Sequence, residues 1–359
     1  MNILILTGKF GMGHASTARA LEQRVTEELP QARVTVADIM EEAVGPASAA
    51  VVYQLFETVV RHGGTIYNKI YRSCNRESSM PIPARQRFFR AIDRLMVRTE
   101  PQVVISTLPL CTRLAAEYKK RDRGRYTLVS CITDISCHSE WIAPGVDLYC
   151  AASVQTKEAL VRAGVDQNRI LVTGVPVRPA FRVPAAGERR AKRVLVMGGG
   201  LGLMPEDPKF YLRLAAIPGV EVTVITGGNG ELYEKLQGLA PNIEVLPFVK
   251  NVDAYMRRCD VMISKPGGIT LFEAIASDLP LLAFCPALEQ EKLNAAFLQQ
   301  HHIGAVLPAS PEPMVWVVED LLLQRGALDE MRRNMDKLRR SMDLGALLYR
   351  LDEREEACA

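Results

Sequence analysis

A chain of 359 residues is long enough for two domains of ordinary size. Its composition, 48% hydrophobic and 24% charged with no low-complexity tract, excludes a largely disordered protein. The net charge of +3 argues against nucleic acid as the main partner. The eight cysteines include no Cys-x-x-Cys pair, which gives no zinc site and is typical of a reducing cytosol.

The first elements predict a parallel sheet. Residues 2–6 are apolar but lack the basic flank and cleavage site of a signal peptide, so we expect a buried strand. A glycine-rich loop follows at 7–14, then a helical pattern at 15–29 and a second strand at 33–37. This order is that of a βαβ unit. No run approaches the length of a membrane-spanning helix, so any membrane contact should be peripheral.

The alternation of strands and helices continues through the first half of the chain and begins again after a linker. In the first half we expect further strands at 103–106, 127–132, 148–151 and 170–172. A proline-rich and polar run at 176–190 is the best linker. After it we expect strands at 193–197, 222–225, 243–246, 261–263 and 281–284. The predicted fold class is therefore α/β, with two doubly wound, Rossmann-like domains at 1–182 and 183–335. A helical tail at 336–359 can cross back to the first domain.

An insertion at 46–98 has no clear strand signal and ends in a basic amphipathic pattern. The side chains that would meet an acceptor or an anionic membrane surface there are Arg85, Arg87, Phe88, Phe89, Arg90 and Arg94. The alternative is a solvated helix that packs its apolar face on the sheet, and the pattern alone favours this alternative.

The stretch 264–274 organises the second half. A short apolar strand leads into a Pro-Gly-Gly turn at 266–268, and Thr270 and Glu273 have the spacing of a capping box, so a helix should start near Ile269. A glycine turn at a helix N-terminus presents free N–H groups and the positive end of the helix dipole, which together bind phosphate. The alternative is an ordinary corner between a strand and a helix.

His14 is the best candidate for a general base. It follows a glycine turn at the start of a helix, where the helix N-terminus favours a neutral imidazole. The alternative is a capping or packing histidine. Asp134 follows a strand end in the same half and could orient His14, contact an acceptor or cap a turn. The glycine loops have neither the G-x-G-x-x-G nor the Walker pattern, so NAD and ATP are poor candidates as ligands.

Several ordered motifs carry a resemblance over nearly the whole chain. They are Gly11-Met12-Gly13-His14, Thr133-Asp134 with His138 and Trp141, residues 173–181, residues 265–270 with Glu273, and Gln290-Glu291-Lys292 with Asn294. In these motifs the chain resembles the diacylglycerol glycosyltransferases, which comprise the monogalactosyldiacylglycerol synthases and the bacterial processive diacylglycerol glucosyltransferases. It is similar, more distantly, to the lipid-linked N-acetylglucosaminyltransferase of peptidoglycan synthesis.

The resemblance implies the GT-B architecture, in which two Rossmann-like domains face a cleft, with the lipid bound by the first and a UDP-sugar by the second. The donor-binding residues that it implies are Gly199, Gly200, Phe248, Val249, Lys265, Pro266, Gly267, Gly268, Ile269, Thr270, Glu273, Gln290, Glu291 and Asn294. The glycine turns would hold the diphosphate, and Glu273 would accept hydrogen bonds from the ribose. The backbone at Phe248 and Val249 would bind uracil, and Gln290 and Glu291 would contact sugar hydroxyls.

The resemblance also implies an inverting transfer, with His14 and Asp134 as catalytic residues and Gly11 and Gly13 on the acceptor side. His14 would deprotonate the acceptor hydroxyl as it attacks the anomeric carbon, while the helix N-terminus stabilises the UDP leaving group. No Asp-x-Asp pair occurs, so we expect no metal and no cofactor beside the donor, UDP-glucose or UDP-galactose. The expected acceptor is diacylglycerol, and the expected location is cytoplasmic, at the inner face of the cell membrane.

Three other functions fit parts of the pattern. One is transfer to another apolar acceptor, such as a secondary metabolite or a polyprenyl lipid. Another is a UDP-N-acetylglucosamine 2-epimerase of the same fold, which would need no acceptor. The third is a non-catalytic module that binds a nucleotide sugar or a lipid, although the joint presence of His14, Glu273 and Gln290 argues against it.

Overall fold

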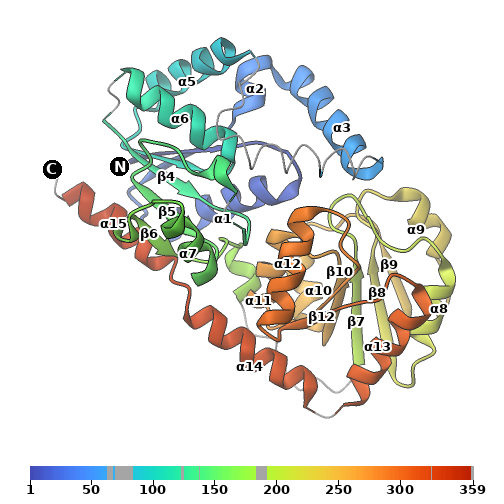
Figure 1. Cartoon of the computed structure of the whole chain (residues 1–359). Helices are drawn as coiled ribbons and strands as arrows, with labels where there is room; N and C mark the ends of the chain where they lie inside the picture. Colours follow the sequence, from blue (N-terminus) through green and yellow to red (C-terminus); the bar gives the residue numbers. More distant parts are fainter. Residues whose placement is uncertain are drawn as a thin grey trace. The chain divides into compact units, whose positions relative to one another are not determined.

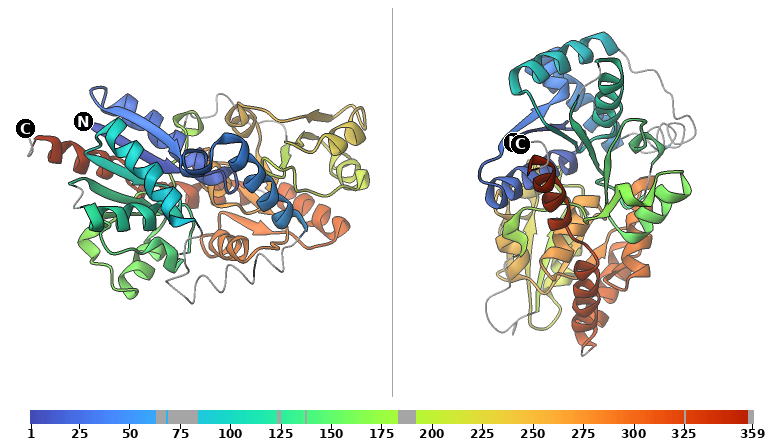
Figure 2. Two further views of the ribbon diagram at one scale, coloured as in Figure 1. Left: turned by 90° about the horizontal axis from the view of Figure 1, so that it is seen from above. Right: turned by 90° about the vertical axis from the view of Figure 1, so that its left-hand side faces the viewer.

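The computed structural model describes residues 1–62, 68, 84–122, 125–136, 138–182, 192–324 and 326–356. Parts of the expected insertion and of the expected linker, residues 63–67, 69–83 and 183–191, lie outside the described residues. The chain divides into two compact units, one made of Met1–Pro179 and Ser341–Ala359 and the other of Ala180–Arg340. Each is a parallel six-stranded sheet with helices packed against it (Figures 1 and 2), so the predicted α/β class with two Rossmann-like sheets is confirmed.

The first sheet has the strand order β2-β1-β3-β4-β5-β6. Its strands are β1 (Asn2–Thr7), β2 (Arg33–Asp38), β3 (Val103–Ser106), β4 (Thr127–Cys131), β5 (Leu148–Ala151) and β6 (Ile170–Val172). The α-helices of this unit are α1 (Met12–Glu28), α2 (Ile39–Val44), α3 (Pro46–His62), α5 (Arg85–Thr99), α6 (Pro109–Asp122), α7 (Val154–Arg162) and α15 (Gly345–Glu356). Short 3₁₀ turns are η1 (Ser139–Trp141), η2 (Gln167–Arg169) and, at the boundary between the units, η3 (Pro179–Arg182). The chain leaves β1 toward β2 and then continues from β3 in the opposite direction, so the strand order reverses between β1 and β3.

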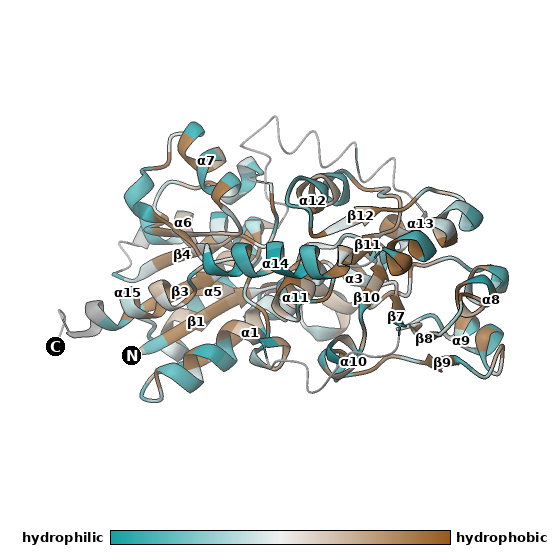
Figure 3. Cartoon of the chain, turned by 90° about the horizontal axis from the view of Figure 1, so that it is seen from below, coloured by the Kyte–Doolittle hydropathy of each residue, from teal (hydrophilic) through white to brown (hydrophobic). Residues whose placement is uncertain are grey.

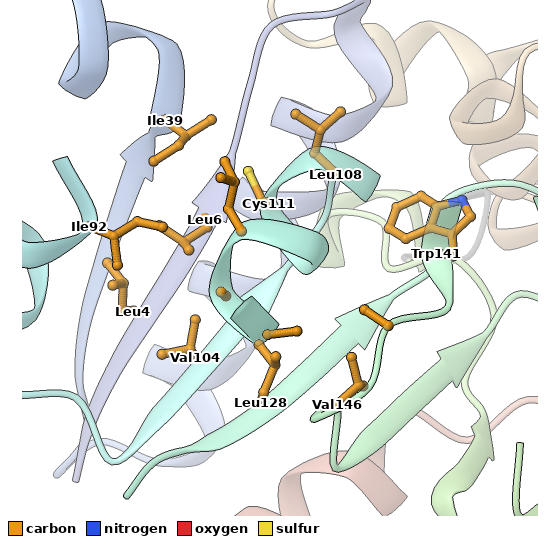
Figure 4. Close-up of a cluster of buried hydrophobic side chains, with 14 of the residues drawn as sticks. Leu4, Leu6, Ile39, Ile92, Val104, Leu108, Cys111, Leu128, Trp141 and Val146 are labelled. Atoms are coloured by element: carbon orange, nitrogen blue, oxygen red, sulfur yellow. The ribbon is translucent and has the colours of Figure 1, made fainter. Parts of the chain in front are cut away.

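Alternate residues of β1 face opposite sides of this sheet, as the pleat requires. Leu4 and Leu6 point into a core shared with α2, α3, α5 and α6 (Figure 4). Ile3 and Ile5 point into a second core, shared with α1 and α15. Both faces of the sheet are covered by helices, which explains why its strands read as continuous apolar runs.

Helix α5 turns its aromatic side chains inward. Phe88 and Phe89 are each 6% exposed and belong to the core on the Leu4 side of the sheet. The prediction that they reach a membrane surface is therefore wrong, and the alternative, a helix that packs its apolar face on the sheet, is correct. An amphipathic pattern predicts that one face is buried but does not say against what. The arginines named with them, Arg85, Arg87, Arg90 and Arg94, are exposed.

The second sheet has the strand order β12-β11-β10-β7-β8-β9. Its strands are β7 (Lys192–Met197), β8 (Val220–Ile225), β9 (Ile243–Leu246), β10 (Val261–Ser264), β11 (Leu281–Ala283) and β12 (Gly304–Val306). Its helices are α8 (Pro208–Ala215), α9 (Gly230–Leu236), α10 (Val252–Arg258), α11 (Gly268–Ala276), α12 (Glu289–Gln300), α13 (Pro311–Leu323) and α14 (Ala327–Arg340). Here the order reverses between β7 and β10. Hydropathy colouring shows brown strands and a largely teal α14 (Figure 3).

Helix α15 comes from a distant part of the sequence and completes the first unit. Leu347 and Leu351 are fully buried and lie in the same core as Ile3 and Ile5. The preceding helix, α14, belongs to the second unit. Among the described residues, no helix combines the length and the apolar character needed to cross a membrane.

Truncation of Leu347 tests the contribution of α15. We expect Leu347→Ala to lower the free energy of unfolding of the first unit by about 2–5 kcal/mol, because it leaves a cavity in a closed core. Urea denaturation followed by tryptophan fluorescence measures this in a Trp316→Phe background, where Trp141 of the first unit is the remaining tryptophan. The matched control is Arg350→Ala, an exposed position on the same helix. Equal effects of the two substitutions would contradict a packing role for α15.

Candidate active site

His14 lies where the strand order of the first sheet reverses. It is in the first turn of α1, after Gly11, whose φ of 79° favours glycine. The His14 Nδ1 atom is 2.7 Å from the Thr107 carbonyl oxygen and 3.1 Å from the Thr133 hydroxyl. These three residues follow β1, β3 and β4, which are neighbours in the sheet. The carboxyl ends of parallel strands meet at one edge, so the sheet brings them together.

The Thr107 carbonyl determines which ring nitrogen of His14 carries the proton. A carbonyl oxygen can only accept a hydrogen bond, so Nδ1–H donates to it, and Nε2 keeps its lone pair in the neutral ring. Burial lowers the pKa of His14 below its ordinary value, while the charge of Asp134 and the bond to Thr107 raise it. A partly buried, neutral imidazole with Nε2 available can act as a general base.

Asp134 acts on His14 through its charge. The described hydrogen bonds of Nδ1 are with Thr107 and Thr133, so these two residues hold the ring. Burial raises the pKa of the Asp134 carboxyl, and His14, the indole of Trp141 and then His138 each lower it. The Asp134 carboxylate thus belongs to the electrostatic environment of the imidazole.

Thr107 has a site position that the sequence did not single out, and Thr133 was named only as part of the motif with Asp134. Thr107 is adjacent to Ser106, where β3 ends, and its hydroxyl is also 2.9 Å from the Thr7 hydroxyl and 3.1 Å from the His14 carbonyl oxygen. The available signal was a polar residue just past the end of each of two buried strands. A comparison of strand ends across the sheet would have found both.

The reversal in the second sheet brings two glycine turns together. One follows β7, where a Cβ atom on Gly202 would lie 2.1 Å from the Thr226 carbonyl oxygen, so the turn requires glycine. The other follows β10 and leads into α11. A Cβ atom on Gly199, in the first turn, would be 3.2 Å from Cε of Lys265 in the second. The predicted residues Gly199, Lys265 and Pro266–Gly268 are therefore neighbours.

The N-terminus of α11 has no side-chain cap. The helix begins at Gly268, with Gly267 as its N-cap. The prediction that Thr270 is the N-cap is wrong, because the glycines adopt the turn without a side-chain acceptor and place Thr270 inside the first helical turn, where it is buried. An uncapped helix N-terminus can bind an anion through its amide groups.

Helix α12 supports the second turn. The Asn294 amide donates to the Pro266 carbonyl oxygen at 2.9 Å, and the Glu291 carboxylate is 3.8 Å from the Lys265 ammonium. The second oxygen of Glu291 accepts hydrogen bonds from the backbone N–H groups of Ala287 and Leu288 at 3.4 and 3.3 Å. Glu291 and Asn294 are both buried, so the structure shows them holding the turn and Lys265.

The other predicted donor residues lie around this edge of the second sheet. Gly200 belongs to the turn after β7, and Glu273 is partly exposed on α11. Gln290 is partly exposed in the first turn of α12. Phe248, which is exposed, and Val249 follow β9, the edge strand beside β8. Their contacts with a ligand remain predictions.

Two family descriptions match the two halves of the chain. The monogalactosyldiacylglycerol (MGDG) synthase family matches residues 14–177, and the glycosyltransferase family 28 C-terminal domain matches residues 195–344. The processive diacylglycerol beta-glucosyltransferase of Bacillus licheniformis is 28% identical over 99% of this chain and 95% of its own length.

Solved structures share the fold at low sequence identity. MurG of Acinetobacter baumannii is 16% identical with a TM-score of 0.64, covering 99% of both chains. The UDP-GlcNAc 2-epimerase of Neisseria meningitidis, bound to UDP-GlcNAc, is 12% identical with a TM-score of 0.58, covering 92% of this chain and 94% of its own. The near full-length match to named transferases, together with the two family matches, decides between these enzyme classes. The chain is a glycosyltransferase with the GT-B fold, and its two halves match the monogalactosyldiacylglycerol synthase family and the glycosyltransferase family 28 C-terminal domain.

Proposed function

We propose that this enzyme transfers a hexose from UDP-glucose or UDP-galactose to diacylglycerol with inversion and without a metal ion. The observation that carries the proposal is the hydrogen bond from His14 Nδ1–H to the Thr107 carbonyl oxygen, which leaves Nε2 as a base. The acceptor is suggested by the names of the matching family and of the Bacillus relative.

In the proposed reaction His14 Nε2 removes the proton from the acceptor hydroxyl. The acceptor oxygen forms a bond to the anomeric carbon, and the bond from that carbon to the phosphate oxygen breaks. UDP leaves with the electron pair, and the proton stays on His14 until it exchanges with water. The attack from the opposite side inverts the configuration at the anomeric carbon.

The second unit supplies positive charge for the leaving diphosphate. Lys265 and the uncapped N-terminus of α11 lie at the same turn, next to the turn that contains Gly199. Fixed dipoles and a cation of this kind stabilise developing negative charge without reorganisation. Within the described residues, no group of three or more His, Cys, Asp or Glu side chains is placed to hold a metal ion.

Two substitutions test the separate roles proposed for His14 in the transfer step and for Lys265 in UDP binding. We expect His14→Ala to lower kcat by about 10²–10⁴-fold with unchanged affinity for UDP, because the base acts only in the transfer step. Lys265→Ala should instead weaken UDP binding, since it removes a cation beside the proposed diphosphate site. Calorimetry with UDP, and thin-layer chromatography of radiolabelled lipid from diacylglycerol vesicles, measure the two effects. Loss of UDP binding in His14→Ala, or conversion of UDP-N-acetylglucosamine without an acceptor, would contradict the proposal.

We further propose a peripheral position on the cytoplasmic face of the membrane, with α3 as the inserting element. Its outward side chains Val51, Val52 and Leu55 are 64%, 37% and 65% exposed. They lie at helical spacing and form one apolar stripe. Helix α2 contacts both α3 and α5. On α5, the exposed Arg87 and Arg90 would each add about 1 kcal/mol of attraction to an anionic surface, whereas Arg85 and Arg98 form ion pairs with Glu117 and Glu42.

The inner side of α3 joins this stripe to the loop that carries His14. The Tyr53 hydroxyl donates to the Asp38 carboxylate at 2.6 Å and fixes the helix against the end of β2. The Phe56 ring packs edge-on against Phe10 with centroids 5.3 Å apart, and Phe10 belongs to the glycine loop before His14. A lipid that contacts α3 would therefore be near the loop of the proposed base.

Two substitutions on α3 that add the same charge distinguish the insertion of apolar side chains from the effect of charge on membrane binding. Leu55→Glu removes an apolar group and adds a negative charge, whereas the control Gln54→Glu adds the same charge at an exposed polar position. Burying a leucine contributes about 1.5–3 kcal/mol, so we expect Leu55→Glu to lower co-flotation with anionic vesicles roughly tenfold or more beyond the control. Equal behaviour of the two variants would show that α3 does not insert.

A further inference from the structure

The turn that follows β8, residues 226–229, has no part in the proposed reaction so far. β8 lies between β7 and β9 in the second sheet (Figure 1), so this turn lies between the glycine turn that contains Gly199 and the segment after β9 that contains Phe248. The backbone N–H and the hydroxyl of Thr226 both donate to the Leu246 carbonyl oxygen, at 2.9 and 3.2 Å. The turn after β8 is therefore fixed to the end of β9.

The other side of this turn packs directly against the glycine turn after β7. A Cβ atom on Gly227, whose φ is 60°, would be 2.8 Å from the Gly199 carbonyl oxygen and 2.9 Å from that of Gly200. Both distances are shorter than the ordinary contact of a methyl group with an oxygen atom, so this position requires glycine. The Gly228 N–H donates to the same Gly200 carbonyl oxygen at 2.9 Å. Both carbonyl groups are thus held toward the turn after β8.

The direction of these carbonyl groups decides where the next N–H group points. In a trans peptide the C=O and N–H groups point in opposite directions, so the Gly200 N–H points away from the turn after β8. Within the described part of the chain it donates to no acceptor, and Gly200 is partly exposed. The adjacent Gly199 is next to the Lys265 side chain. An N–H group of this kind beside a cation is suited to an anionic oxygen.

We propose that Gly227 is a positioning residue for the nucleoside diphosphate. Its lack of a side chain allows the turn after β8 to hold the peptide between Gly199 and Gly200, and the Gly200 N–H donates to a phosphate oxygen of UDP. The turn joins the segment after β9, proposed to bind uracil, to the turn proposed to bind the diphosphate. The inference rests on the proposed function, which supplies UDP as the ligand.

Alanine substitutions at glycines of the second unit test this role. Gly227→Ala places a methyl group against two carbonyl oxygens and should raise the dissociation constant of UDP, measured by calorimetry, roughly tenfold or more. The matched control is Gly238→Ala, because Gly238 has a similar φ of 66° and no atom within 4 Å of its Cβ position. It carries the same backbone strain, and we expect its UDP affinity to be unchanged.

A second pair of variants covers the case in which Gly227→Ala does not fold. A Cβ atom on Gly228 would be 3.3 Å from the Gly200 carbonyl oxygen, so a small shift accommodates it, and Gly228→Ala should weaken UDP binding about threefold. Gly230 has no atom within 4 Å of its Cβ position, and Gly230→Ala should bind UDP as the wild-type enzyme does. Unchanged affinity in Gly227→Ala, or equal affinities in Gly228→Ala and Gly230→Ala, would overturn the proposal.

Steady-state kinetics separate the positioning role from a merely structural one. Gly227→Ala should raise the KM for the UDP-sugar roughly tenfold, with a smaller change in kcat and an unchanged acceptor KM, because it alters donor binding alone. A loss of thermal stability equal to that of Gly238→Ala, with the donor KM of the wild-type enzyme, would mean that the turn only packs. That result would refute the positioning role.

The wild-type enzyme and Lys265→Ala distinguish failure of this inference from failure of the proposed function. If wild type and Gly227→Ala bind UDP equally while Lys265→Ala binds it weakly, the diphosphate site is retained and the role of Gly227 is refuted. If the wild-type enzyme does not bind UDP, the proposed function fails and the role of Gly227 fails with it.

Discussion

The hydrogen bond between His14 and the Thr107 carbonyl oxygen depends on one property of the first sheet. β1 and β3 are neighbours, but the chain leaves them in opposite directions. At such a reversal the two connections run to opposite sides of the sheet, so the loops that follow the two strands can approach each other. The proton on Nδ1, the lone pair on Nε2 and the partial burial that keeps the ring neutral all follow from this approach.

The strand order of the second sheet also reverses, between β7 and β10, but different groups lie at this point. β7 and β10 both lead into glycine turns, and the turn after β7 approaches the Lys265 side chain in the turn after β10. Helix α12 then supplies buried polar contacts to the turn through Asn294 and to the lysine through Glu291. The first sheet thus carries a partly buried imidazole at its reversal and the second carries a lysine beside an uncapped helix N-terminus, although the strand orders of the two sheets differ.

Much of the fold and part of the candidate site could be predicted from the sequence, because strands that are buried on both faces appear as continuous apolar runs. Most strand positions, the glycine turns and the location of His14 at a helix start were readable in this way, whereas the short edge strand β12 was not predicted. Thr107 was not singled out, since it is 93 positions from its partner and only its place just past the end of a buried strand marks it. Phe88 and Phe89 were misassigned because helical periodicity defines a face without naming what covers it. The N-cap of α11 was misassigned for a related reason, although the helix begins within one residue of the expected start: Thr270 has the spacing of a cap, but the glycines before it already make the turn.

The return of α15 to the first unit has a consequence for synthesis on the ribosome. The second unit is one continuous segment, Ala180–Arg340, whereas the face of the first sheet that α1 and α15 share is only partly covered until residues 345–356 have emerged. Domains usually acquire their structure in the order in which they are translated. In this protein the unit that is translated first is therefore completed last, because Ile3 and Ile5 share a core with Leu347 and Leu351.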